Sequence, residues 1–211
     1  MVLGAGIAAG PAALLLPIPS VQADTSAPIS SQGEAFEDDE YTLFAPGGFN
    51  YIDIAIPRKE VGPAPERSPL RVRFDAQEGG ASLSVVVKMA NQLKFTFTQV
   101  NDISAFGGPE QAANLLLPRG AVLLGYSKEV VVLKPRVTAL GEVEVPPRTY
   151  YRYDFNAPNG ERVYMSVAAA RGKVFVCGGS ALPSQWQQQS IGPKLVESVK
   201  SFRLKEATPA A

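Results

Sequence analysis

The chain has 211 residues, and 20 lysines and arginines balance 20 aspartates and glutamates, so its formal net charge is zero. This length suits a single domain with a proper core, and the balanced charge excludes a global field that attracts nucleic acid or an anionic membrane. The absence of histidine and the single cysteine exclude histidine-dependent catalysis, His-ligated zinc, an intramolecular disulfide and multi-cysteine metal clusters.

Residues 1–23 form an apolar stretch without a charged side chain, and they include three consecutive leucines that begin at Leu14. The stretch ends in Val-Gln-Ala23, the small-x-small pattern that signal peptidase cleaves. Three prolines interrupt it, whereas a spanning helix needs about 20 consecutive apolar residues. We therefore predict an export segment, cleaved after Ala23, and a soluble mature protein. The basic region that normally precedes such a segment is missing, so we expect the precursor to begin upstream of Met1.

The next stretch, residues 24–40, is polar and ends in an acidic cluster from Glu37 to Glu40. It holds too little apolar surface to offset the cost of ordering, so we predict a flexible acidic arm. The ordered domain is predicted over residues 41–205, and residues 206–211 are predicted to form a disordered tail.

Apolar side chains that alternate with polar ones predict several strands in the domain. The predicted strands cover Phe49–Ile56, 70–75, 82–89, Glu129–Lys134, Thr149–Phe155, Arg162–Ala170 and Val174–Cys177. Helices are predicted from Pro109 to a point before Pro118, because proline is favoured in a first helical turn, and over Leu195–Phe202 from apolar spacing.

Turn residues indicate how these strands pair. Gly79-Gly80 predicts antiparallel pairing of the strands on either side of it. Asn159-Gly160 favours a tight hairpin, because both residues tolerate positive φ, and Arg171-Gly172 turns the chain again. The last three strands are therefore predicted to form an antiparallel meander. Cys177 continues an apolar run within it, so we expect this thiol to be buried.

The sequence contains no arrangement that predicts catalysis. There is neither a GxxxxGK phosphate loop nor a GxGxxG motif after a strand. Glu142 and Glu144 lie in a polar loop and are interpreted as solvated charges, and the acidic arm lacks the spacing of a calcium loop. We therefore expect no enzymatic activity, no catalytic or metal-binding residues, and no cofactor that can be recognised from the residues.

From about Phe49 to Leu204 the chain resembles the PsbP family, the extrinsic lumenal proteins of the photosystem II oxygen-evolving complex, and its PsbP-like relatives. The first half of the resemblance is carried by Gly48-Phe49, Leu70-Arg-Val-Arg-Phe74, Leu83-Ser-Val-Val-Val87 and Gly108-Pro109-Glu110. The second half is carried by Tyr150-Tyr151, Val174-Phe-Val-Cys177, Trp186, Leu195-Val-Glu-Ser-Val199 and Ser201-Phe202.

The resemblance implies an α+β fold, an α/β/α sandwich with a central antiparallel sheet. It also implies a location in the chloroplast thylakoid lumen, peripheral to the membrane, and a role on photosystem II in oxygen evolution and ion retention. Calcium association is implied by the resemblance alone. The chain departs from the lysine-rich composition typical of photosystem II members, and its N-terminal arm is acidic.

The leading hypothesis is therefore a non-catalytic PsbP-type protein that docks on the lumenal surface of photosystem II or another photosynthetic complex. One alternative is an assembly or auxiliary factor for such a complex, and another is a small-ligand carrier with its site between sheet and helix. Nucleic acid is not an expected partner. The most basic exposed stretch is a loop with Arg58, Lys59 and Arg67, which we predict as the docking site.

Overall fold

The computed structural model describes residues 33–54, 69–138, 141–187 and 191–206. The predicted export segment, its cleavage site, residues 24–32 of the predicted arm, and nearly all of the predicted tail lie outside the described residues.

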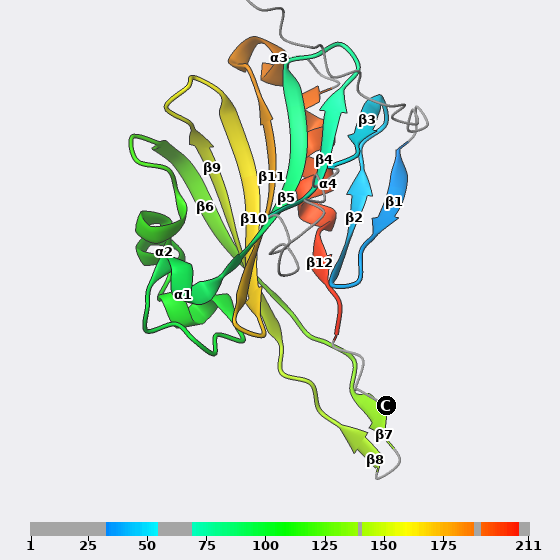
Figure 1. The fold of residues 1–211 in the computed structure, drawn as a ribbon, viewed down its shortest axis with the longest axis vertical. Helices are drawn as coiled ribbons and strands as arrows, with labels where there is room; N and C mark the ends of the chain where they lie inside the picture. Colours follow the sequence, from blue (N-terminus) through cyan, green and yellow to red (C-terminus); the bar gives the residue numbers. More distant parts are fainter. Residues whose placement is uncertain (1–32, 55–68, 139–140, 188–190, 207–211) are drawn as a thin grey trace, which may run out of the picture.

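A seven-stranded antiparallel sheet, in the order β3-β4-β5-β11-β10-β9-β6, forms the centre of the molecule (Figure 1). Its strands are β3 (Phe49–Ile52), β4 (Leu70–Ala76), β5 (Ala81–Met89), β6 (Val122–Val131), β9 (Arg148–Asn156), β10 (Arg162–Ala170) and β11 (Lys173–Ala181). Successive side chains on each strand point to opposite faces, and β9, β10 and β11 contribute to a core on each face.

The first core lies between the sheet and a layer formed by the N-terminal and C-terminal segments of the domain. This layer contains α4 (Ile191–Ser201) and a small sheet of β1 (Glu34–Glu37), β2 (Tyr41–Ala45) and β12 (Arg203–Leu204). Phe175, Leu195 and Phe202 are fully buried there. The short helix α3 (Pro183–Gln187) precedes α4 and places Trp186 at the edge of this core.

The second core covers part of the opposite face, beneath three short helices: α1 (Ala90–Leu93), the 3-10 helix η1 (Ile103–Phe106) and α2 (Pro109–Leu116). Tyr151 and Tyr153 of β9 are buried there. Their hydroxyls donate hydrogen bonds to the carbonyl oxygens of Gly107 (2.6 Å) and Pro109 (2.8 Å). These bonds fix the start of α2 against the sheet.

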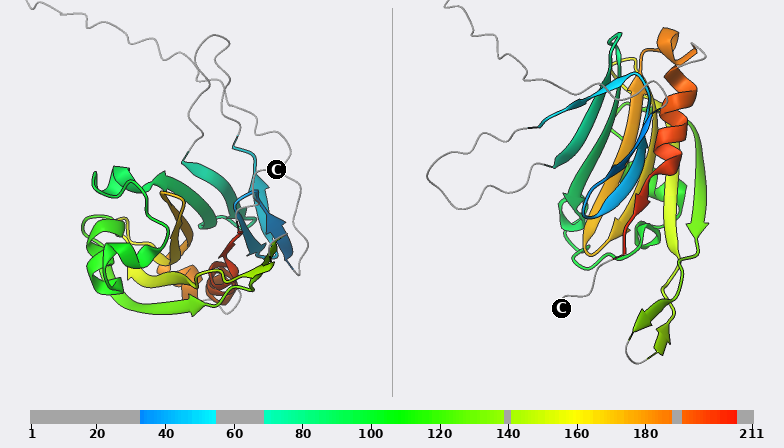
Figure 2. Two further views of the ribbon diagram at one scale, coloured as in Figure 1. Left: turned by 90° about the horizontal axis from the view of Figure 1, so that it is seen from below. Right: turned by 90° about the vertical axis from the view of Figure 1, so that its right-hand side faces the viewer.

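A two-stranded hairpin, β7 (Arg136–Thr138) and β8 (Gly141–Val143), connects β6 to β9. It projects beyond the end of the central sheet (Figures 1 and 2).

Several predictions from the sequence are confirmed. The α+β class, the antiparallel pairing of β4 with β5, and the meander of β9, β10 and β11 are present. The helix predicted at Pro109 is α2, and the C-terminal apolar spacing corresponds to α4, which ends at Ser201, one residue before the predicted end. Cys177 is buried.

Other boundaries differ from the predictions. The strand predicted over Glu129–Lys134 begins at Val122, seven residues earlier, and ends at Val131. Pairing with β9 explains this extension, because most side chains on β6 are exposed and give no alternation of burial. β1 falls inside the stretch predicted as a flexible arm, so ordered structure begins before Tyr41, contrary to the prediction. β3 ends at Ile52, and the predicted continuation to Ile56 reaches beyond the described residues.

Candidate functional site

The residues predicted to dock a partner, Arg58, Lys59 and Arg67, lie in the segment between β3 and β4, outside the described residues. Two clusters of charged and polar side chains lie at opposite ends of the central sheet.

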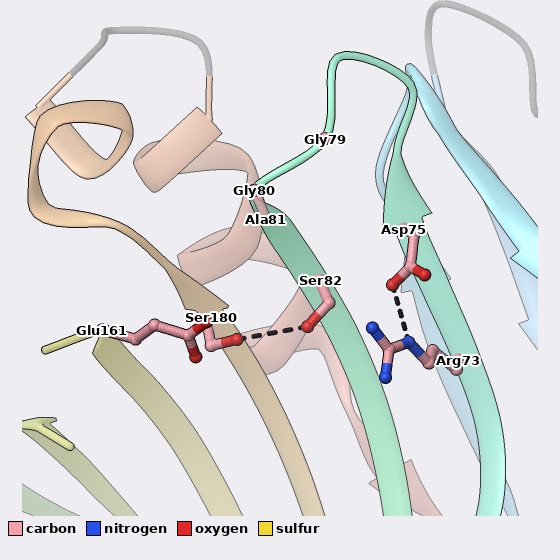
Figure 3. Close-up of a pocket in the computed structure, with 8 residues that line it drawn as sticks. All are labelled: Arg73, Asp75, Gly79, Gly80, Ala81, Ser82, Glu161 and Ser180. Atoms are coloured by element: carbon pink, nitrogen blue, oxygen red, sulfur yellow. Dashed lines mark hydrogen bonds and ion pairs between the residues drawn. The ribbon is translucent and has the colours of Figure 1, made fainter. Parts of the chain in front are cut away.

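The first cluster lines a hollow of about 190 Å³ beside the turn between β4 and β5 (Figure 3). It lies on the face of the sheet that α4 does not cover. Ser82 of β5 lies opposite Ser180 of β11 at the floor of the hollow, and Ser84 lies opposite Gly178. These two strands therefore present only small side chains there. Small side chains on adjacent strands leave the hollow open.

The polar groups of this hollow are partly paired with one another. Arg73 Nε donates to Asp75 Oδ1 at 2.7 Å, and the hydroxyls of Ser82 and Ser180 are 3.1 Å apart. Glu161 completes the lining, so two carboxylates accompany one guanidinium. Ligand clefts usually enclose about 300–1,000 Å³. The hollow is smaller, and its chemistry suits hydrogen bonds with polar side chains of a partner.

The second cluster is centred on Glu40, in the turn between β1 and β2. Its carboxylate accepts a hydrogen bond from Lys173 Nζ at 2.8 Å and another from Arg71 Nη2 at 3.2 Å. Arg171 Nη2 approaches to 3.5 Å, and the Glu40 side chain is only 12% exposed. Three cations therefore converge on one largely buried carboxylate at this end of the sheet.

Glu40 also explains why the acidic stretch is ordered. Its cations come from β4, from the turn between β10 and β11, and from β11 itself. Glu37 adds an ion pair with Lys205, which follows β12. These long-range partners hold β1 and β2 on the domain. The low apolar content of this stretch predicted a flexible arm. The partners that order it lie more than 30 positions away along the chain, where the local pattern cannot indicate them.

A cavity of about 330 Å³ adjoins Arg171 and is lined by Asn101, Asp102, Val145, Pro146, Pro147, Arg148 and Ala170. Asp102 accepts hydrogen bonds from the backbone N–H groups of Ser104 and Thr149, each at 2.8 Å. Burial raises the pKa of Asp102, but these hydrogen bonds favour the carboxylate more strongly, so the pKa lies below its usual value. Asp102 thereby ties η1 to the start of β9.

The one thiol and four tyrosines, Tyr41, Tyr150, Tyr151 and Tyr153, are removed from solvent. Burial strongly raises the pKa of Cys177, which disfavours the reactive thiolate. Burial likewise raises the pKa values of Tyr41 and Tyr153. Among the described residues, His, Cys, Asp and Glu side chains form no group of three or more placed to hold a metal ion.

The helices within the described ranges include none with the length and apolar character that crossing a bilayer requires.

Comparison with known proteins gives a structural match alone. No model of a known protein family matches the sequence, and no curated protein matches it. Among solved structures, the chain is similar to the solution structure of cyanobacterial PsbP (CyanoP) from Synechocystis sp. PCC 6803, with a TM-score of 0.52 and 15% sequence identity. The match covers 90% of this chain and 99% of that one. The chain therefore has a PsbP-like fold.

Proposed function

We propose that this chain is a non-catalytic, PsbP-type extrinsic protein that associates with the lumenal side of a photosynthetic complex. The observation that carries the proposal is the match to cyanobacterial PsbP along nearly the whole length of both chains. In this proposal the layers on the two faces of the sheet complete an α/β/α sandwich, and photosystem II is the leading partner. The location is the thylakoid lumen.

The character of the surface supports a docking role. The only thiol is buried, whereas the polar hollow and the Glu40 cluster present paired charges near the surface. Salt-bridged side chains held by a rigid sheet supply fixed hydrogen-bonding groups for a protein partner. The oxygen-evolving role and calcium retention are part of the proposal through family resemblance.

The alternative of an assembly or auxiliary factor shares this fold and differs in how long the protein stays bound. A small-ligand carrier is less well supported. The space between sheet and α4 where it needs a site is occupied by Phe175, Leu195 and Phe202, all 0% exposed.

Native electrophoresis of thylakoids from the organism that encodes this chain tests the proposal. A tagged mature protein should comigrate with photosystem II and remain at a constant ratio to it after purification of the complex. Comigration limited to smaller assembly intermediates would support the auxiliary factor instead. Migration as a free protein in gently solubilised thylakoids would contradict the proposal.

The docking role of Arg58, Lys59 and Arg67 is tested by changing all three to alanine. If they dock on acidic surfaces, membrane retention at low salt should fall, and a wash at about 1 M salt should release the wild type, because screening shortens to about 3 Å. A matched control changes the exposed cations Lys88, Lys94 and Arg119, which removes the same charge. Equal membrane retention of both triple variants would show that Arg58, Lys59 and Arg67 do not dock the protein.

A further inference from the structure

β6 is a long edge strand with an unusually apolar surface. It ends the central sheet and pairs with β9 on one side, with a register shift between Leu123 and Gly125 and a regular register from Gly125 to Val131. Five large apolar side chains along it and just beyond it are at least half exposed: Val122 60%, Leu124 51%, Tyr126 50%, Val130 51% and Val132 83%. Long apolar edges invite pairing with another strand, and proteins normally protect them with charges or prolines.

The charges on β6 give little of that protection. Glu129 lies on one face of the sheet. Its carboxylate pairs there with Arg152, and its Oε1 lies 3.2 Å from Arg203 Nη2. Lys128 lies on the other face, because it stands opposite Tyr151 of β9, next to the pair of Tyr126 and Tyr153. One lysine therefore accompanies the apolar side chains on that face.

We propose that β6 pairs in antiparallel fashion with β6 of a second copy of this chain, about a two-fold axis at Ser127. Two-fold symmetry makes the interface self-complementary and joins the two central sheets at their edges. In this register Ser127 faces its own copy, and Tyr126 faces Lys128 of the partner. Gly125 faces Glu129 of the partner.

Charge selects this register over its neighbours. A two-fold axis at Lys128 places two ammonium groups opposite each other, which is destabilising. An axis at Tyr126 places Lys128 against Leu124, where its charge meets an apolar side chain. An axis at Ser127 places Lys128 beside the ring of Tyr126, whose π-system attracts a cation.

Charge also favours a second copy as the occupant. The whole chain has no net charge, so two copies approach without long-range repulsion. Glu129 already has two guanidinium partners, so it needs no cation from another protein.

The hairpin of β7 and β8 adds further apolar surface to the same edge. Val137 is 77% exposed and Val143 is 52% exposed. The hairpin continues past the end of the sheet (Figure 1), so in an antiparallel pair it extends beyond the first residues of the partner's β6.

Cysteine cross-linking tests the register directly. In the proposed dimer the Cβ atoms of two Ser127→Cys residues lie about 4.5–5.5 Å apart, close enough for a disulfide after a small adjustment. A matched variant, Val130→Cys, places its thiols about 20 Å apart, because they are separated by six residues along the paired strands. Cys177 is buried and does not interfere. Mild oxidation should cross-link the first variant and leave the second monomeric on a denaturing gel. Equal cross-linking of both would overturn the register.

Sedimentation velocity tests the dimer itself. The wild type should show a concentration-dependent dimer, and Leu124→Lys/Val130→Lys should shift it to monomer, because lysines on an edge block pairing. The control, Phe95→Lys/Leu182→Lys, adds the same charge at exposed apolar positions away from β6 and should still dimerise. Circular dichroism checks that all variants are folded. A monomeric wild type at every concentration, or a dimer that survives the β6 substitutions, would overturn the proposal.

Discussion

Gly179 lies in β11 beneath Leu195 of α4, and its replacement by alanine tests how tightly the helix and the central sheet fit. A Cβ atom at this position would lie 3.0 Å from Leu195 Cβ and 3.1 Å from Leu195 Cδ2. Carbon atoms in favourable contact are about 3.5–4.0 Å apart. Leu195 is fully buried and its Cβ is fixed to the helix backbone, so α4 and β11 must move apart by about 0.5 Å.

The neighbouring glycine provides a matched control on the opposite face. A Cβ at Gly178 would meet Met165 Cβ at 3.7 Å, an ordinary contact. Overpacking a core costs about 1–3 kcal/mol, and removing a strand glycine returns about 0.5–1 kcal/mol. We therefore expect Gly179→Ala to lower the free energy of unfolding by about 1–2 kcal/mol. Gly178→Ala should leave it unchanged or raise it by up to about 1 kcal/mol.

Urea denaturation of both variants measures this difference. A double-mutant cycle with Leu195→Ala adds a second check. That change alone costs about 2–5 kcal/mol. It removes the contacts of Leu195 Cγ and Cδ2 with the new methyl group and leaves only the Cβ contact. The double variant should be more stable than the sum of the single changes predicts, by about 1 kcal/mol. The reasoning is refuted if Gly179→Ala proves as stable as Gly178→Ala, or if the cycle shows no coupling.

Three further predictions concern two partly buried carboxylates and the thiol. Asp102→Asn should lower the free energy of unfolding by about 1–2 kcal/mol at neutral pH, because it weakens the hydrogen bonds from Ser104 and Thr149. Because the folded pKa of Asp102 is lowered, its contribution is present above about pH 4 and is lost as the pH falls through the folded pKa. The difference in free energy of unfolding between wild type and variant, measured by urea denaturation, should therefore become smaller in acid. A difference that stays constant with pH would contradict a lowered pKa for Asp102. Glu40→Ala should lower the free energy of unfolding by about 1–3 kcal/mol, because it leaves partly buried cations unpaired. Glu37→Ala removes a more exposed ion pair and should cost less than about 1 kcal/mol, so equal losses in thermal melts would argue against a special role for Glu40. Cys177 should react with a bulky thiol reagent only as the protein unfolds, and rapid labelling of the native protein would show that it is accessible.

The strands that could be predicted from sequence are those whose side chains divide between a core and a polar face. β4 and β5 show this alternation, and the Asn159-Gly160 turn set the pairing of β9 with β10. In these segments the local pattern and the final burial agree, because each strand pairs with a neighbour that is close in sequence. Cys177 was predicted correctly for the same reason.

The segments that were missed depend on distant partners. β1, β2 and β12 bring the two ends of the domain together, and β12 has only two residues, too few for a pattern. β6 is mostly exposed, so its pairing with β9 left no alternation in the sequence. The polar hollow requires Arg73, Ser82 and Glu161 from three separate strands or turns, and only the sheet order brings them together.

The sequence by itself determined the chemistry that is available and the local strands and turns. It contains no histidine, it has one thiol within an apolar run, and its turn residues specify an antiparallel meander. Tertiary structure alone decided that Glu40 is an anchor with three cationic partners and that β6 is an exposed edge. The physical reason is that charge pairing and edge position depend on which segments become neighbours in space, and those neighbours lie tens of residues apart in the chain.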